Sequence, residues 1–546
     1  MEWKEGTQAH GIEPDTDVDM TGRIRAFIRE ELADGTRRFR FKPGVYEIAD
    51  EKARRDFEAL MSGSGQWDLG ESVDLKNTFL SFEGMERIEL DFQGSVLRFH
   101  GLIQPFSFRA CKEVVIRNVR IDWARPLFSQ GEIVAADENG LEIAFDPAYP
   151  VASGLPIAAM LDFVPGSAHP LRCKLDWFYF ADRTELTGEQ RVRISYKPHI
   201  RDQVMSGSRA APSPGQHVVV RHVMNYKSAF LFYQCDNVAM ENVTIYTAPG
   251  MGVIGHGCGD VTMRGLRVMR RPGSRNVLST NTDATHFIGC SGTITFDDCL
   301  FEGMGDDATN VHGFYVSVRE IGGDRSLVCG IDADIQSECS EIPAPGDRME
   351  LTRRATLKPY GVLTVRKAER LPNGDVEIQF EEDVRGYEMG DLLTNVSRMA
   401  TLRFTNSIVR NNRARAILVQ TRDAVIADNT FDHCTGSAIH VNCAEGWMES
   451  AATQDVSVTR NLFLSCGFGG GTYRGASALA LMTESKEAEA GVHRGFAFTG
   501  NVVYGNGIRG VSLSSLDGGY VSGNRFIDSG ENVHVDWEHC SGIVVD

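Results

Sequence analysis

The 546-residue sequence lacks the features of several large protein classes. No apolar run approaches the about 20 residues of a membrane-spanning helix, and the polar start, MEWKEGTQAH, is unlike a signal peptide. We therefore expect a cytoplasmic protein, or a secreted or periplasmic one whose leader was removed. Positive charge is in deficit, with 56 Lys and Arg against 74 Asp and Glu. Because phosphate binding needs clustered cations, nucleic acid and anionic membranes are excluded as main partners.

The 12 cysteines lack the patterns of redox and zinc sites, since they form no CxxC pair and no metal-type spacing with histidine. Four of them, Cys111, Cys235, Cys258 and Cys290, occupy the same phase of a repeated pattern. We interpret these four as small buried apolar residues rather than as halves of disulfides.

What the sequence does contain is a repeat. The segments FRACKEVVIRNVRID, FYQCDNVAMENVTIY, GHGCGDVTMRGLRVM and FIGCSGTITFDDCLF each carry a cysteine and, seven residues later, Asn118, Asn242, Gly265 or Asp297. A step of 23 residues separates Cys235 from Cys258, Asn406 from Asn429 and Asn501 from Asn524. Short alternating strands repeated every 20 to 30 residues or so are typical of a parallel β-helix. We expect the asparagines to form a ladder of hydrogen bonds at a coil corner.

Two regions interrupt the repeat with hairpin-like alternation and contain the turn signals Asn139-Gly140 and Asn373-Gly374. Before the repeats, TGRIRAFIREELADG has helical spacing and would close the first end of a solenoid. The predicted fold is all-β: a right-handed parallel β-helix with an N-terminal capping helix and two inserted small antiparallel β-barrel domains. The predicted domains are 1–126 (cap and first coils), 127–216 (first barrel), 217–313 (central coils), 314–397 (second barrel) and 398–546 (C-terminal coils).

Three aspartates, Asp283, Asp306 and Asp307, stand out in the stretch NTDATHFIGCSGTITFDDCLFEGMGDDATNVHG. The step from Asp283 to Asp306 is again 23 residues, so we expect them to stack on neighbouring rungs about 4.8 Å apart, with Asp307 beside them. Three carboxylates this close cannot all ionise without mutual cost, so at least one should have a raised pKa. A protonated acid beside ionised bases is what cleavage of a glycosidic bond requires.

The order of these residues resembles a known series. Asn281–Asp283, Asp306–Asp307 and His312–Gly313 are similar to the NTD, DD and HG motifs of polygalacturonases, which are inverting β-helix hydrolases. In that family an Arg-x-Lys pair that grips the uronate carboxylate follows the His-Gly, whereas this chain continues FYVSVREIGG. We therefore expect an uncharged sugar at the reacting position.

A closer resemblance is to glycoside hydrolase family 110, the α-1,3-galactosidases that remove terminal galactose from blood group B type glycans. The segments that carry it are Phe92 to Pro126, Asp283 to Gly313, Asn411 to Ala416 (NNRARA) and Gly446 to Ser450 (GWMES). The resemblance implies inverting exo-hydrolysis of terminal α-1,3-linked galactose, from branched or linear glycans, without a metal or other cofactor. Ala416 in place of an expected glycine and Met448 in place of a common aromatic residue leave the exact glycan open.

Carried over by this resemblance, Asp306 is the general acid, and Asp283 and Asp307 hold and deprotonate the attacking water. The sequence does not choose a base, because coupled carboxyls titrate as a unit. Inversion requires the acid and base carboxyls about 6.5 to 9.5 Å apart. The further candidates for contacts to the sugar are Asn281, Thr282, His312, Arg413, Arg415, Trp447, Glu449 and Trp123. His312 could alternatively orient the acid.

Arg413 and Arg415 alternate along one predicted strand and fit either sugar hydroxyls or surface salt bridges. Trp447 and Glu449 pair an aromatic face with a carboxylate, a usual way to hold a pyranose. A β-helix lyase with aspartates around Ca²⁺, a hydrolase of galacturonan and a glycan-binding solenoid without catalysis stay open as alternatives. The expected partner is a terminal α-galactosyl glycan, and a solenoid with barrels has ample side surface for a homodimer.

Overall fold

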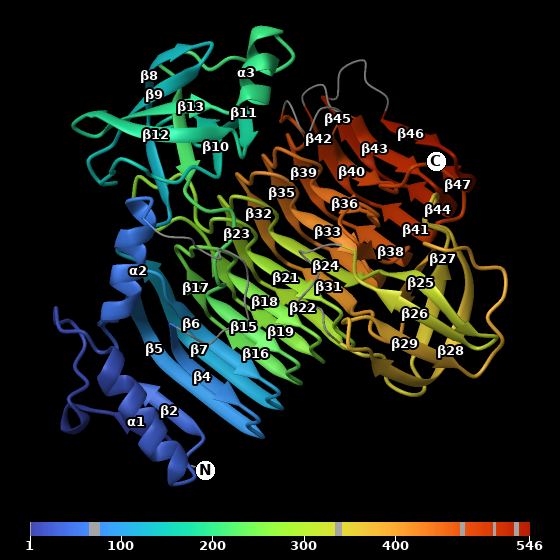
Figure 1. Cartoon of the computed structure of the whole chain (residues 1–546), viewed down its shortest axis with the longest axis horizontal. Coiled ribbons are helices and arrows are strands. Elements are labelled where there is room, and N and C mark those ends of the chain that lie inside the picture. Colours follow the sequence, from blue (N-terminus) through green and yellow to red (C-terminus); the bar gives the residue numbers. More distant parts are fainter. Residues whose placement is uncertain (1, 65–76, 333–340, 470–475, 506–508, 529–533) are drawn as a thin grey trace.

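The computed structural model describes residues 2–64, 77–332, 341–469, 476–505, 509–528 and 534–546. Parallel coils stack along the molecule from the N-terminal to the C-terminal end (Figure 1), which confirms the predicted β-helix. The capping helix is present as α1 (Thr21–Ala33), followed by α2 (Glu51–Met61). No helix in the described part of the chain is long and apolar enough to cross a membrane.

One long parallel sheet contributes two short strands to most coils, because the chain bends within the coil at residues such as Asn118 and Asn242, whose φ is positive. Its strands are β1 (Lys4–Gly6), β2 (Arg38–Phe41), β3 (Val45–Ile48), β5 (Arg87–Phe99), β7 (Glu113–Trp123), β16 (Val238–Glu241), β17 (Thr244–Ile245), β19 (Val261–Arg264), β20 (Arg267–Val268), β22 (Thr293–Asp297), β23 (Leu300–Glu302), β31 (Thr401–Thr405), β32 (Ile408–Arg410), β34 (Arg422–Ala427), β35 (Thr430–Asp432), β38 (Gln454–Thr459), β39 (Leu462–Leu464), β41 (His493–Thr499), β42 (Val502–Tyr504), β44 (Leu516–Ser522), β45 (Arg525–Ile527) and β47 (Ser541–Val545).

A second parallel sheet closes the coils and positions the acidic cluster. Its strands are β4 (Thr78–Glu83), β6 (Gln104–Arg109), β15 (Phe230–Tyr233), β18 (Val253–His256), β21 (Thr285–Ile288), β24 (Thr309–Phe314), β33 (Ile417–Gln420), β36 (Ile439–Val441), β40 (Ser477–Leu481), β43 (Arg509–Ser514) and β46 (Val535–Glu538). The short strand β37 (Glu449–Ser450) pairs antiparallel with the end of β24. Alternate side chains of these strands fill the core, where Phe106 stacks on Phe230 with ring centroids 4.8 Å apart.

The repeated cysteines and asparagines have the predicted structural roles. The four repeat cysteines are buried and free, and the thiol of each donates to a backbone carbonyl of the preceding coil, as Cys258 does to Phe232 O at 3.3 Å. The side-chain oxygen of Asn501 accepts from the backbone N–H of Asn461 at 2.8 Å, and the side-chain oxygen of Asn461 accepts from the backbone N–H of Asn429 at 3.0 Å. This ladder satisfies backbone donors at the coil corner.

The first insertion is a seven-stranded antiparallel sheet in the order β11-β10-β14-β8-β9-β13-β12, with α3 (Pro198–Met205). No pairing joins its end strands within this described region, so the sheet is open where a barrel was expected. It also extends past residue 216, because β14 pairs with both β8 and β10. The strands are β8 (Phe128–Asp137), β9 (Gly140–Phe145), β10 (Ala159–Phe163), β11 (Leu171–Phe178), β12 (Ala181–Gly188), β13 (Arg191–Tyr196) and β14 (His217–Arg221).

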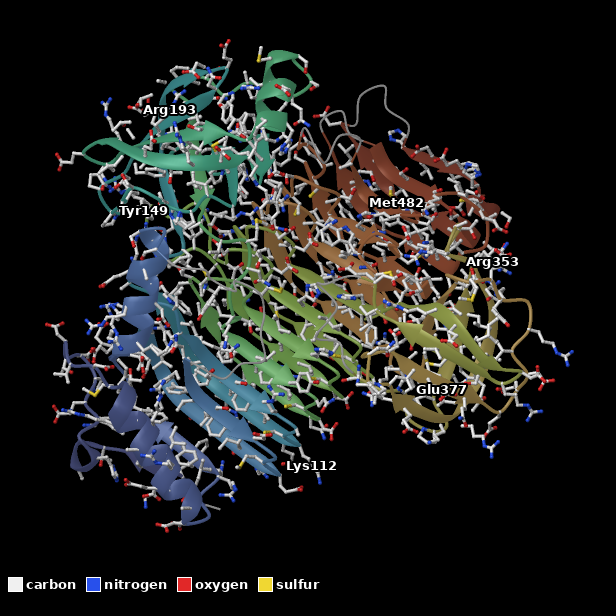
Figure 2. All side chains as sticks on the ribbon, in the orientation of Figure 1. Lys112, Tyr149, Arg193, Arg353, Glu377 and Met482 are labelled. Carbon is white, nitrogen blue, oxygen red and sulfur yellow. The ribbon has the colours of Figure 1, made fainter. Side chains whose placement is uncertain are left out.

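The second insertion is a closed antiparallel barrel, as predicted. Its strands are β25 (Val316–Gly323), β26 (Ser326–Gly330), β27 (Arg348–Thr352), β28 (Pro359–Arg370), β29 (Val376–Phe380) and β30 (Leu392–Asn395). In Figure 1 the first insertion and the barrel lie on opposite sides of the coils that carry β21, β24 and β33. Tyr149 of the first insertion, labelled in Figure 2, donates from its hydroxyl to Asn276 Oδ1 of the coils at 2.6 Å.

Candidate active site

Asp283, Asp307 and Arg415 lie two residues ahead of β21, β24 and β33, at equivalent places on three successive rungs. The register pairs the first residues of these strands directly, and the step from β21 to β24 is 24 residues. Asp283 therefore lies under Asp307, and the predicted stacking of Asp283 under Asp306 is wrong. The physical reason is that strand pairing sets the register coil by coil, and this coil is one residue longer than the 23-residue step from β15 to β18.

Arg415, which is partly exposed, holds the buried Asp307 in a bidentate ion pair. Its Nε and Nη2 donate to the two carboxylate oxygens at 2.8 and 2.7 Å, and its backbone N–H donates to Oδ1 at 2.9 Å. Burial nevertheless raises the pKa of Asp307 to about 7, with repulsion from Asp306 and Asp283 adding to it and Arg415 opposing it. Asp307 is thus a carboxyl that gains and loses its proton near neutral pH.

Asp283 is buried between the backbone of Asp307 and a histidine that the sequence analysis did not select. Its Oδ1 accepts from the Asp307 N–H at 3.2 Å, and its Oδ2 is 2.8 Å from Nδ1 of His286. Burial, with repulsion from Asp306, raises the pKa of Asp283 well above its ordinary value. The expected raised pKa among the three acids is therefore present, and it is shared by Asp283 and Asp307.

The ring of His286 contacts the ring of His312, which lies on the neighbouring rung. The two Nε2 atoms are 2.8 Å apart, and Nδ1 of His312 is 2.6 Å from the carbonyl oxygen of Gly313. Burial lowers the pKa of His312 to about 4 and also lowers the pKa of His286. Both rings are therefore neutral near pH 7.

Asp306 stands outside the stack and exposes 25% of its side chain. One oxygen from each of Asp283, Asp306 and Asp307 lies within 4.8 Å of the others. Nη1 of Arg413 is 2.8 Å from Asp306 Oδ1. The cluster thus has one accessible carboxyl in front of two buried ones.

Residues of the first insertion fix the turn before Asp306. Sequence reasoning predicted the insertion but missed this contact. The Gly305 carbonyl accepts from Arg221 Nη1 at 3.1 Å and from Arg413 Nη1 at 3.3 Å. Arg413 also forms a fully buried pair with Asp176 of β11 at 3.1 Å, and its guanidinium lies 4.8 Å from the ring of Phe178. No local signal could have found these contacts, because their partners are 84 to 237 residues apart in sequence.

Glu449, which belongs to β37, lies beside His312 and Asn310 of β24. It accepts from Gln420 Nε2 and, at 3.4 Å, from Asn310 Nδ2, and its Oε1 is 3.9 Å from His312 Nε2. Burial raises the pKa of Glu449, but His312, His286 and Gln420 outweigh it, so the pKa is lowered overall. Trp447, two residues earlier, is 55% exposed.

Trp123, Asn281 and Thr282, which were predicted as sugar contacts, also have partners within the protein. Trp123 is 4% exposed, stacks on Phe99 at 5.0 Å and donates its indole N–H to Gly101 O. The structure therefore does not join Trp123 to the acids, because its position on β7 points into the core. Asn281 donates to Val223 O at 2.6 Å, and Thr282 donates to Asn225 Oδ1 at 3.3 Å.

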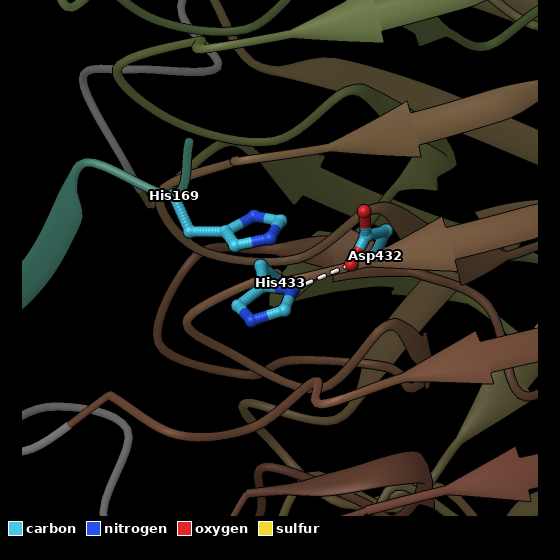
Figure 3. A group of neighbouring side chains, drawn as sticks. All are labelled: His169, Asp432 and His433. Carbon is cyan, nitrogen blue, oxygen red and sulfur yellow. Dashed lines mark hydrogen bonds and ion pairs between the residues drawn. The ribbon is translucent and has the colours of Figure 1, made fainter. Parts of the chain in front are cut away.

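Among the described residues, three groups bring possible metal-ligand atoms within 4.8 Å of one another: the three aspartates; His286, His312 and Glu449; and His169, Asp432 and His433. The last group lies where the first insertion meets the coils (Figure 3). The rings of His169 and His433 stack with centroids 3.4 Å apart and planes 6° apart. Their in-plane lone pairs therefore run parallel rather than converging, and the group acts as a contact between insertion and coils.

No protein-family profile matches the chain. An alpha-1,3-galactosidase B of Akkermansia muciniphila is 29% identical over 397 residues, which cover 70% of this chain and 49%, about half, of that protein. An alpha-1,3-galactosidase B of Bacteroides fragilis is 30% identical over 417 residues, which cover 71% of this chain and 68% of the relative. The chain belongs to the α-1,3-galactosidase family. A further α-1,3-galactosidase B, from Parabacteroides distasonis, is 29% identical over 85% of this chain and 78% of its own.

Among solved structures, the tailspike protein of E. coli bacteriophage HK620 gives a TM-score of 0.42 at 9% identity, covering 98% of this chain and 64% of the tailspike. The family 28 exopolygalacturonase of Yersinia enterocolitica gives 0.39 at 10% identity, covering 99% and 77%. In this member of the α-1,3-galactosidase family, the segments Asp283 to Gly313, Asn411 to Ala416 and Gly446 to Ser450 meet around one carboxyl cluster.

Proposed function

We propose that the chain is an exo-acting, inverting glycoside hydrolase that releases terminal α-1,3-linked galactose from blood group B type or linear α-galactosyl glycans. Membership of the family supports the reaction class. The observation that carries the proposal is the carboxyl cluster, in which oxygens of Asp283, Asp306 and Asp307 lie within 4.8 Å of one another and only Asp306 is substantially exposed. One water hydrogen-bonded at about 2.8 Å spans two oxygens at this separation.

In this proposal Asp306 is the general acid, because it is the carboxyl that a glycosidic oxygen can approach. Asp306 lies outside the Asp283 and Asp307 stack, so the spacing of one rung, too short for inversion, does not apply to it. The nearest carboxylate oxygens of the three aspartates lie within 4.8 Å of one another, which is below the separation of about 6.5 to 9.5 Å usual between the carboxyls of inverting enzymes, so the anomer released is the test of inversion.

The charge around the cluster favours a neutral sugar. Arg413 and Arg415, the cations nearest the three aspartates, are already paired with carboxylates. Glu449 and Glu484 add further acidic groups close by, since both act electrostatically on Asp307 or Asp283. A uronate would meet net negative charge here, whereas the hydroxyls of galactose can donate to these oxygens. Glu449 and the exposed face of Trp447 are the proposed sugar contacts.

The test is to incubate the protein with α-galactosyl, α-N-acetylgalactosaminyl and galacturonyl oligosaccharides and to follow the released anomer by NMR. We expect β-galactose first, from an α-1,3 linkage. Initial release of α-galactose would disprove inversion, and release of no galactose would disprove the proposed substrate. An unsaturated product absorbing in the ultraviolet would instead support a lyase.

The role of Asp306 is tested by the leaving group. Asp306→Asn should lose several orders of magnitude in kcat/KM on an oligosaccharide but much less on an aryl α-galactoside whose phenolate departs without protonation. A glycan-binding protein without catalysis predicts no turnover by either the wild type or the variant.

A further inference from the structure

A continuous series of hydrogen bonds runs from Asp283 through His286 and His312 to the carbonyl of Gly313, and the proposed function gives this hydrogen-bonded chain no role. Its three links are 2.8, 2.8 and 2.6 Å long, and all four groups belong to two adjacent rungs. The inference drawn from it rests on the proposed function and names the base and a positioning residue of that reaction.

Only a few placements of the hydrogen atoms satisfy all three hydrogen bonds of this chain. The Gly313 carbonyl is only an acceptor, so Nδ1 of His312 carries a hydrogen. If His312 is neutral, its Nε2 accepts and Nε2 of His286 must donate. A neutral His286 then has a bare Nδ1, so the hydrogen in the link to Asp283 must come from the carboxyl.

The other solutions place the same proton elsewhere. Either His286 or His312 becomes a cation, and Asp283 is then an ionised acceptor. In all three cases the unit of Asp283 and the two histidines holds one titratable proton and has no net charge. Without that proton, two lone pairs would face each other at 2.8 Å in one of the links, which is repulsive.

We infer that this unit retains one proton throughout the working pH range, that Asp283 therefore accepts and orients the attacking water without deprotonating it, and that Asp307 is the general base. His286 is the positioning residue, since it acts through Asp283. Asp283 Oδ1 faces the backbone N–H of Asp307 and not the histidine, so one of its oxygens remains an acceptor on the side of the cluster. Asp307 instead accepts from the guanidinium of Arg415, whose charge favours its ionised form.

The surroundings favour the first of the three solutions. The charged or titratable groups that act on the unit are Asp306, Asp307, Arg415, Glu449 and His256. Burial lowers the pKa of both histidines and raises the pKa of Asp283, so the proton lies on Asp283 when the rings are neutral. Asp307, whose pKa is raised to about 7, can give up its proton and become a base in the same pH range.

The decisive comparison is Asp283→Asn against Asp307→Asn, because an asparagine at 283 mimics the protonated carboxyl. Its amide can donate to His286 Nδ1, and its oxygen can accept from the Asp307 N–H. On an aryl α-galactoside we expect Asp283→Asn to lose about tenfold in kcat and Asp307→Asn about a thousandfold or more. Circular dichroism and thermal unfolding serve as folding controls for both variants.

Azide provides an independent test of the base. In Asp307→Ala, azide can occupy the place of the carboxylate and water, and we expect it to restore turnover and give β-galactosyl azide. Asp283→Ala should give no such product. Equal losses in the two asparagine variants, or azide rescue at position 283 only, would overturn the assignment of the base. If the wild type releases no galactose, the proposed function fails instead, so the two failures are distinguishable.

The role of His286 is tested by the pH profile. His286→Ala breaks the chain, so Asp283 can ionise beside Asp307, and the acid limb of kcat/KM should move up by about 1 to 2 pH units. In the Asp283→Asn background the same substitution should leave the limb in place, which a purely structural role would not predict. Loss of wild-type activity in EDTA with recovery on adding Zn²⁺ would overturn the inference, because a cation between the two Nε2 atoms would replace their hydrogen bond.

Discussion

The ion pair between Arg415 and Asp307 leads to a quantitative prediction for Arg415→Gln. If Asp307 is the base, activity requires its ionised form, so kcat/KM falls as pH drops below the pKa of Asp307, about 7. Arg415 lowers this pKa. Removing its charge should therefore raise the pKa of Asp307 and move the acid limb of the profile to higher pH.

The size of the shift follows from the geometry. With charge centres about 4 Å apart and an effective dielectric constant near 20, the Arg415 and Asp307 pair contributes about 4 kcal/mol, or about 3 pKa units. Arg415 is a quarter exposed, and water entering the space reduces the effect to about 1 to 2 units. The variant should thus lose about 10- to 100-fold at pH 6 relative to the wild type and less at pH 9.

The assay is kcat/KM for an aryl α-galactoside between pH 4 and 9. Arg410→Gln is the matched control, since Arg410 lies on the same coil but pairs with Glu302 at 2.8 Å, on the other sheet. The reasoning is refuted if the limb of Arg415→Gln coincides with that of the control or moves to lower pH.

Three further predictions concern the support of the site. Gly305→Ala should abolish most activity, because its Cβ would lie 2.1 Å from Asn281 O; full kcat with unchanged thermal unfolding would contradict this. Asp176→Ala leaves buried Arg413 with one carboxylate fewer and should cost about 3 kcal/mol, seen as a lower unfolding midpoint in denaturant; an unchanged midpoint would refute a stabilising pair. Trp447→Ala should raise KM for the oligosaccharide severalfold without changing the unfolding midpoint, because its side chain is 55% exposed; an unchanged KM would exclude the sugar contact.

Much of the fold could be predicted because the β-helix is encoded locally. Each coil repeats the same alternation of apolar and polar residues, with a small residue or asparagine at the bend, so the pattern survives without knowledge of distant contacts. The buried cysteine column and the asparagine ladder from Asn429 to Asn501 follow from this repeat. The first insertion was harder, because hairpin signals do not tell an open sheet from a closed barrel.

Part of the site had an unread signal in the sequence. His286 lies three residues after Asp283, at the outward position of a strand whose Phe287 is buried. His312 lies on the same face one rung later, where it pairs with Ile288, two residues beyond His286. Two outward-facing histidines on adjacent rungs, one of them close in sequence to Asp283, would have indicated the hydrogen bonds that link Asp283 to His286 and His312. Trp123 was the opposite case, since an aromatic residue beside an insertion is equally compatible with the core, and its indole is buried there.

By itself the sequence determined the solenoid and the presence of three aspartates near one another, because each of these depends on residues close together in the chain. Only the tertiary structure decided which aspartates stack, since strand pairing made this coil 24 residues long and placed Asp283 under Asp307. It also decided that Asp176 and Arg221 of an insertion anchor Arg413 and the Gly305 turn. Such contacts form between segments that are far apart in the sequence, so the local sequence of one segment does not indicate its partner.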